Sequence, residues 1–358
     1  MKKLPIVIDA AIMTECCTYY KMAVIQTSQH YNEWAASHLE IYGHESLGCA
    51  FGYNQRQYDL KDFDNILSFQ EIDLWSVLPD KIVERLKEEI DSENYIILDC
   101  NFQKLFPEEV DRFYIHETLL FGYDDRQEVF YSSALSNGVF QEITIPFSKM
   151  RESYEDIYGY YKSHMEEKID RQLYFFNITR MRLKENDCHE NGIFSFLLKV
   201  KREADGVRLV TEKYTQDGVR QDEFYTGIYC LKGFEKGAER LFYQQEVSDD
   251  TIHSFVLSLK KLHEHRKIIL SSMYWLIEKL DGGEGEVLDA ALQYASCCES
   301  MRLTYRLAYK YVLTRRREIL WKIKERLGKQ YIRERAALCG FEERARRLYC
   351  DYRAPQKE

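Results

Sequence analysis

Two segments in the first hundred residues show the apolar spacing of amphipathic helices. In residues 78–94, apolar side chains recur at the three- and four-residue intervals of one helix face, and Pro79 stands near the start. Residues 14–29 have the same spacing, with Thr14 as the expected N-cap and Cys16 on the apolar stripe. The pattern predicts one helix in each segment.

Residues 95–146 carry shorter apolar runs of β-strand length. Four runs are separated by an aromatic loop or by turn signals, and they cover residues 95–100, 114–123, 128–135 and 139–146. Consecutive strands with short connections favour an antiparallel meander. A helix followed by such a sheet indicates an α+β fold.

The last third of the chain has long helical periodicity. Residues 251–280 and residues 287 to about 328 predict two long antiparallel helices, separated by the glycine-rich break at 281–286 and followed by a shorter helix. The texture changes near residue 150, so we expect two domains. The first would span residues 1–150, and the second, residues 151–358, would be mostly helical and would cover or extend the cleft of the first.

Composition narrows the classes of function. The formal net charge of -9 argues against a whole-chain nucleic-acid binder, because phosphate contacts need a positive field. No apolar run reaches the length of a membrane span, and Asp9 interrupts the only apolar stretch near the start. Ten scattered cysteines fit reduced thiols. We therefore expect a cytoplasmic protein with no membrane and no nucleic-acid partner.

Basic residues concentrate after Arg302, where they alternate with apolar ones. This pattern favours the solvated face of amphipathic helices, and the alternative is a docking surface for an acidic partner. No metal or other cofactor is predicted. The cysteine doublets are adjacent rather than spaced as zinc ligands, and the imidazoles of His263 and His265 would lie about 200° apart on a helix.

The candidate chemistry lies in three residues of the first domain. Cys16 and Cys17 fall in the first turn of a predicted helix, and His116 falls in a predicted strand. A thiol acts as a nucleophile when it is a thiolate, which a helix N-terminus and a neighbouring imidazolium both favour. Alone, each residue is more typical of a buried core position. Helix geometry does not decide which sulfur faces a cleft.

The context of His116 carries a family resemblance. Residues 94–150, "NYIILDCNFQKLFPEEVDRFYIHETLLFGYDDRQEVFYSSALSNGVFQEITIPFSKM", run from a strand through an aromatic loop to the histidine, then through "GYD" into another strand. This order resembles the N-terminal domain of the butirosin biosynthesis protein H family, itself similar to the double-glycine-leader cysteine peptidases of the papain-like superfamily. The resemblance implies a papain-like domain at residues 1–150.

The resemblance also implies a function. Cys16 or Cys17 would attack an acyl or peptidyl thioester on an acidic carrier protein in natural-product biosynthesis, with His116 as the base. Two alternatives remain. One is a catalytically silent domain of the same fold that binds a carrier protein or peptide intermediate, and the other is a small-peptide amidase or peptidase.

The sequence departs from the papain-like pattern at two places. The glutamine that usually precedes the nucleophile by about six residues is replaced by Ala10 or Ala11. The residue that orients the histidine would be Ser132 or Ser133, since a serine can accept the imidazole N–H. Carboxylates at 99, 124 and 125 would replace it only if loops bring them near.

Overall fold

The computed structural model describes residues 1–44, 49–51, 63–136, 138–164, 178–184, 192–215, 218–280 and 285–353. The chain divides into two compact units, and each combines segments that are distant in sequence. Unit 1 comprises Met1–Tyr31 and Phe63–Asp187, and unit 2 comprises Asn32–Asp62 and Cys188–Glu358. This division differs from the expected boundary near residue 150.

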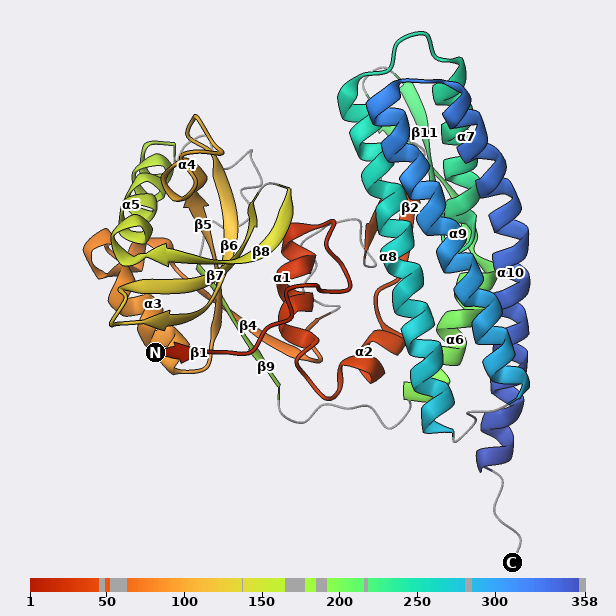
Figure 1. The fold of residues 1–358 in the computed structure, drawn as a ribbon, viewed down its shortest axis with the longest axis horizontal. Coiled ribbons are helices and arrows are strands. Elements are labelled where there is room, and N and C mark those ends of the chain that lie inside the picture. The colour runs from red at the N-terminus through yellow and green to blue at the C-terminus, as the bar shows by residue number, and fades with distance from the viewer. Residues whose placement is uncertain are drawn as a thin grey trace, which may run out of the picture. The chain divides into compact units, whose positions relative to one another are not determined.

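Unit 1 is built on an antiparallel sheet in the order β4-β9-β5-β6-β7-β8, with β1 paired to β6 (Figure 1). Its strands are β1 (Lys2–Lys3), β4 (Leu67–Ile72), β5 (Tyr95–Asn101), β6 (Ile115–Asp124), β7 (Val129–Ser136), β8 (Val139–Pro146) and β9 (Ile178–Leu183). The predicted four-strand meander is confirmed as β5 to β8. Strand β9 returns from later in the chain and pairs between β4 and β5.

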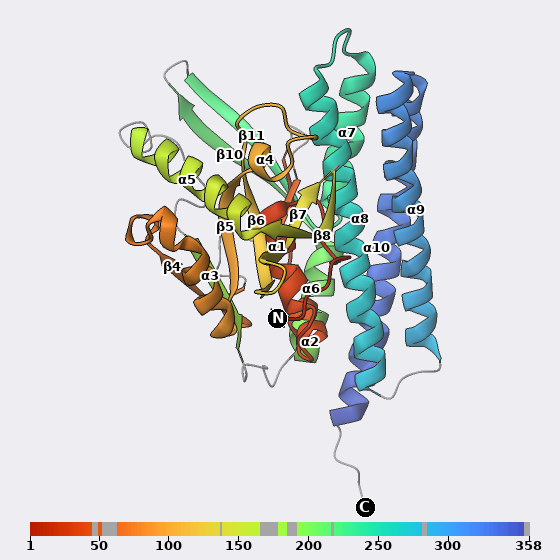
Figure 2. The ribbon, with the colours of Figure 1, turned by 60° about the vertical axis from the view of Figure 1, so that its left-hand side comes forward.

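Helices cover both faces of this sheet (Figure 2). They are α1 (Cys16–Ile25), α3 (Ile82–Asp91), the short α4 (Phe102–Leu105) and α5 (Phe147–Ser163), with 3₁₀ turns at Leu74–Ser76 and Pro79–Lys81. Helices α3 and α5 lie on one face, and α1 lies on the other. The apolar side of α3 is buried as predicted, together with Tyr154, Ile157 and Tyr161 of α5. These α5 residues explain why unit 1 extends past residue 150.

Unit 2 joins a small sheet to a set of long helices. Its elements are α2 (Tyr31–Ser37), β2 (Ile41–His44), β3 (Cys49–Phe51), α6 (Gly192–Asp205), β10 (Val207–Thr215), β11 (Gly218–Thr226), α7 (Tyr229–Tyr243), α8 (Asp249–Lys279), α9 (Glu286–Thr314) and α10 (Glu318–Arg353). The sheet order is β10-β11-β2-β3, so β2 lies between β3 and the β10–β11 hairpin, which comes much later in the chain.

The helix expected from residue 287 to about 328 ends earlier, at Thr314. Arg315 adopts a left-handed conformation with φ 52°, and its N–H donates to the Tyr311 carbonyl at 2.8 Å. Glycine usually adopts this helix-ending conformation, so an arginine at this position does not predict the end of a helix. The helix that follows, α10, has 36 residues, and the expectation of a shorter last helix is wrong.

The architecture is therefore α+β, with antiparallel sheets throughout the described residues. Within the same residues, no helix carries an apolar stretch that would reach across a membrane.

Candidate active site

Cys16 is the first residue of α1. The N-cap position belongs to Glu15, one residue after the expected Thr14, and the Glu15 side chain makes no capping bond. The helix is held by its apolar side, because Tyr20, Ala23 and other residues of this stretch are fully buried in unit 1. The Cys16 side chain itself is half-buried. It thus lies at the positive end of a helix dipole.

His116 stands near the start of β6, and its imidazole meets the Cys16 thiol. The distance from Cys16 Sγ to His116 Nε2 is 3.5 Å, within the range of a hydrogen bond to sulfur. Two residues that are 100 positions apart in sequence come together because α1 packs against the sheet containing β6. The structure therefore assembles one of the two candidate cysteines with the candidate histidine. The side chain of Cys17 lies outside the described residues.

Glu117 holds the other side of the imidazole. His116 Nδ1 lies 3.0 Å from the Glu117 carbonyl oxygen and 3.6 Å from its carboxylate Oε2. When Nδ1 carries the proton, it donates to the carbonyl and leaves Nε2 free to accept the thiol proton. The Glu117 side chain is only 16% exposed. Tyr20 of α1 donates its hydroxyl hydrogen to the Glu117 carbonyl at 2.6 Å, which shows how closely α1 covers this strand.

The structure does not place Ser132 at the imidazole. Its hydroxyl lies 2.5 Å from Thr118 Oγ1 and donates to the Leu119 carbonyl at 3.1 Å, fully buried inside the sheet. In the β6–β7 register Ser132 faces Leu120, four residues beyond His116 and thus about 13 Å along the strand. The predicted role for Ser132 fails because counting residues gave no information about this register. Ser133 instead bonds the Tyr19 hydroxyl at 2.8 Å.

The alternative carboxylates are also engaged elsewhere. Asp99 of β5 faces Glu117 in the β5–β6 register, but its carboxylate accepts the Tyr161 hydroxyl of α5. Burial raises the pKa of Asp99 to about 7, although the Tyr161 bond acts in the opposite direction. Asp124 and Asp125 lie at the far end of β6, where they bond the Arg126 N–H and Lys87. None of these three carboxylates has a described contact with His116.

The missing glutamine has a structural explanation. The Ala11 N–H donates to the side-chain oxygen of Gln26 at 2.7 Å, and Gln26 caps the C-terminal end of α1. Ten residues of helix separate Gln26 from Cys16, which is about 15 Å. A glutamine at position 11 would therefore lie at the wrong end of α1. The backbone N–H groups of the first turn are the remaining candidates for oxyanion donors.

Aromatic rings line the histidine. The ring centroids of Phe102 and Tyr114 lie 5.0 Å and 5.9 Å from that of His116. Burial raises the pKa of the Tyr114 hydroxyl, with a further contribution from the charges of Cys16 and Glu117. The site is thus partly dry and tends toward negative charge. One donor atom each from Cys16, His116 and Glu117 also lies within 4.8 Å of the others, which is close enough to consider a metal ion.

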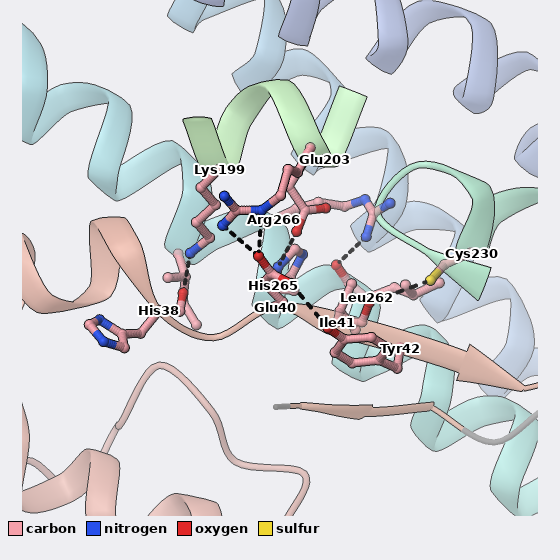
Figure 3. A network of polar contacts seen from close by, with 12 residues as sticks. His38, Glu40, Ile41, Tyr42, Lys199, Glu203, Cys230, Leu262, His265 and Arg266 are labelled. Atoms are coloured by element: carbon pink, nitrogen blue, oxygen red, sulfur yellow. Dashed lines mark hydrogen bonds and ion pairs between the residues drawn. The ribbon is translucent and has the colours of Figure 1, made fainter. Parts of the chain in front are cut away.

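A second polar cluster lies inside unit 2 (Figure 3). Lys199 is buried and donates to the Ala35 carbonyl at 2.9 Å and to the His38 carbonyl, and burial lowers its pKa to about 8. His265 is buried as well, and its Nε2 lies 3.3 Å from the Glu203 carboxylate. Lys199 thus binds one carbonyl in the last turn of α2 and one just after the helix, and we assign this cluster a structural role.

No model of a known protein family matches the sequence, and neither does any curated protein.

Proposed function

We propose that the protein is a thiol acyltransferase or amide-forming enzyme, with Cys16 as nucleophile and His116 as general base. The observation that carries this proposal is the 3.5 Å approach of Cys16 Sγ to His116 Nε2 at the N-terminus of α1. A thiol at a helix start, next to an imidazole whose other nitrogen is held by a carbonyl oxygen, has the features of an activated nucleophile.

The reaction would proceed in two steps, which are acylation of Cys16 and transfer of the acyl group to an amine. The Cys16 thiol gives its proton to His116 Nε2, and the thiolate attacks the carbonyl carbon of a thioester. The donor's thiolate leaves with the proton from the imidazolium, and an acyl group remains on Cys16. An acceptor amine then attacks this acyl group and loses a proton to His116, while the Cys16 thiolate departs and is reprotonated.

Glu117 would act as a positioning residue in both steps. Its backbone carbonyl fixes the Nδ1–H tautomer, and its carboxylate, 3.6 Å from Nδ1, favours the imidazolium that forms when the thiol loses its proton. Glu117 would thus orient the imidazole, which is the role predicted for Ser132.

An acidic carrier protein is the proposed donor. Among the described basic residues of the last helices, several are already in ion pairs, including Arg315 with Asp249 and Lys324 with Glu239. Others are exposed and have no described ion pair, including Lys322, Lys329 and Arg333 of α10. These remaining cations support a docking surface for a partner of negative charge.

The proposal is tested by looking for the covalent acyl intermediate on Cys16. The full-length protein is incubated with an acyl thioester of a carrier protein, without an acceptor amine, and analysed by intact mass and peptide mapping. We expect an acyl adduct on Cys16 that disappears in Cys16→Ala and forms at least about 100-fold more slowly in His116→Ala.

Cys17→Ala is the matched control, since it removes a neighbouring thiol and should retain the adduct. An adduct that persists in Cys16→Ala would assign the chemistry to another sulfur. Absence of any adduct, together with carrier binding that survives Cys16→Ala and weakens with salt, would instead support a catalytically silent carrier-binding protein. The position of Ala11 at the far end of α1 is the observation that favours this second candidate.

A further inference from the structure

We infer that Cys16, His116 and Glu117 also form a binding site for a thiophilic divalent cation, with Zn²⁺ as the natural fit. This site does not depend on the proposed acyl transfer, although the two uses of Cys16 exclude each other. Thiolate and imidazole together favour zinc over the hard cations Mg²⁺ and Ca²⁺, which prefer oxygen ligands.

The distances suit a tetrahedral ion. A zinc ion bound to one sulfur at about 2.3 Å and one nitrogen at about 2.0 Å holds these two atoms about 3.5 Å apart. The observed distance from Cys16 Sγ to His116 Nε2 is 3.5 Å. One ligand atom each from Cys16, His116 and Glu117 lies within 4.8 Å of the others, so a small inward shift of the Glu117 carboxylate would complete the set.

The second coordination shell is already in place. Histidine ligands usually donate their other ring N–H to a carbonyl or carboxylate, which fixes the ring. His116 Nδ1 makes this contact with the Glu117 carbonyl at 3.0 Å, and Nε2 is thereby directed toward Cys16.

Charge and burial support the same site. A thiolate and a carboxylate together neutralise a divalent cation, and the half-buried positions of all three residues reduce competition from water. Three protein ligands leave a fourth position for water or another small ligand. Binding releases the proton of the Cys16 thiol and removes the sulfur from nucleophilic chemistry.

The first experiment uses Co²⁺ as an optical substitute for Zn²⁺ in the reduced, metal-free full-length protein. We expect a near-ultraviolet thiolate-to-cobalt absorption band that Zn²⁺ abolishes by displacement and Mg²⁺ does not. The band should vanish in Cys16→Ala and in His116→Ala, and Glu117→Gln should weaken cobalt binding by at least about tenfold. Circular dichroism of each variant establishes that the fold is kept.

Two controls separate this site from other thiols. Cys17→Ala should retain the band, and so should a variant in which the exposed Cys339 and Cys350 are both serine. A wild-type protein without the band, or a band unchanged by Cys16→Ala, would overturn the inference.

The second experiment measures whether bound Zn²⁺ protects the Cys16 thiol from alkylation, and it does not depend on acyl transfer. Saturating Zn²⁺ should slow alkylation of Cys16 by iodoacetamide at least about tenfold, and a chelator should restore it. Alkylation at an unchanged rate would show that the ion does not reach the thiol. If the acyl adduct fails to form in metal-free protein while the cobalt band is present, the acyltransferase proposal fails and the metal site stands.

Discussion

At the residue scale, the sequence indicated His116 and the pair Cys16 and Cys17, but it did not decide between the two cysteines and did not indicate Glu117. The cysteine and histidine belong to a recognisable order of elements, and their side-chain chemistry restricts what they can do. A glutamate on a strand is expected to point to water, so the sequence does not indicate a role for Glu117 at the site. Its carbonyl and carboxylate both lie near Nδ1 of the preceding residue, a contact that the strand pattern does not predict.

The raised pKa of Asp99 predicts how the stability of the protein depends on pH. Its pKa of about 7, raised by burial, means that the folded protein keeps a proton which the unfolded chain releases near pH 4. Stability should therefore fall as the pH rises from about 4 to about 7, by an amount on the order of a few kcal/mol. Asp99→Asn should lack this fall and be more stable than the wild type at pH 8, because the amide oxygen still accepts the Tyr161 hydroxyl.

The measurement is urea unfolding of both proteins at pH 4.5 and at pH 8, with the difference in the free energy of unfolding taken at each pH. Asp64→Asn, at an exposed position, is the control for the lost charge and should not reproduce the effect. An Asp99→Asn variant with the same pH dependence as the wild type would show that Asp99 is ionised in the folded state throughout.

At the element scale, strong periodicity predicted the meander and α3, whereas two features depended on tertiary structure. Strand β9 is only six residues long and follows a segment without a clear pattern, so its place between β4 and β5 could not be read from local sequence. Helix α9 ends at Arg315, which adopts a left-handed backbone conformation. Glycine adopts this conformation readily, whereas a residue with a Cβ atom such as arginine disfavours it. Local propensity does not encode either of these choices.

The pairing of β1 with β6 depends on a glycine. A Cβ atom at Gly122 would stand 2.6 Å from the Lys2 carbonyl oxygen and 2.9 Å from the Lys3 Cα, both of which are backbone atoms. Gly122→Ala should therefore push β1 away and destabilise the protein by about 1–3 kcal/mol. Thermal unfolding together with hydrogen exchange at the Leu4 amide, which donates to the Phe121 carbonyl, reports both effects.

Gly159→Ala is the matched control for this substitution. Gly159 lies exposed in α5, and a Cβ atom there would meet nothing within 4 Å. Because alanine favours a helix over glycine, this variant should be stabilised by about 0.5–1 kcal/mol. Equal effects of the two substitutions would contradict the close approach of β1.

At the scale of the whole molecule, the domain organisation was the least predictable property. A change in sequence texture near residue 150 suggested one cut, but the chain passes between its two units three times. Residues 32–62 belong with the helical unit because β2 pairs with β11, and residues 147–183 belong with the first unit through α5 and β9. The β2–β11 and β4–β9 pairings join segments more than a hundred residues apart, and composition does not record such pairings.

A fragment that ends at residue 150 should therefore not fold. It would lack Tyr154, Ile157, Tyr161 and Ile178, each buried in the core of unit 1. Each loss costs about 2–5 kcal/mol, so the four together cost about 8–20 kcal/mol, which is as large as the roughly 5–15 kcal/mol that typically stabilises a folded domain. The fragment 1–187 retains these residues and should unfold cooperatively on heating, as followed by circular dichroism. A cooperative transition in the fragment 1–150 would contradict the division described above.

The position of β9 also has a consequence for the order in which the protein matures on the ribosome. Because Ile178–Leu183 hydrogen-bonds to β4 on one side and β5 on the other, these two strands have no direct partner in each other. The sheet of unit 1 can therefore be completed only after Ile178–Leu183 has left the ribosome. The Cys16 thiol therefore lacks its complete surroundings in unit 1 until Leu183 has left the ribosome.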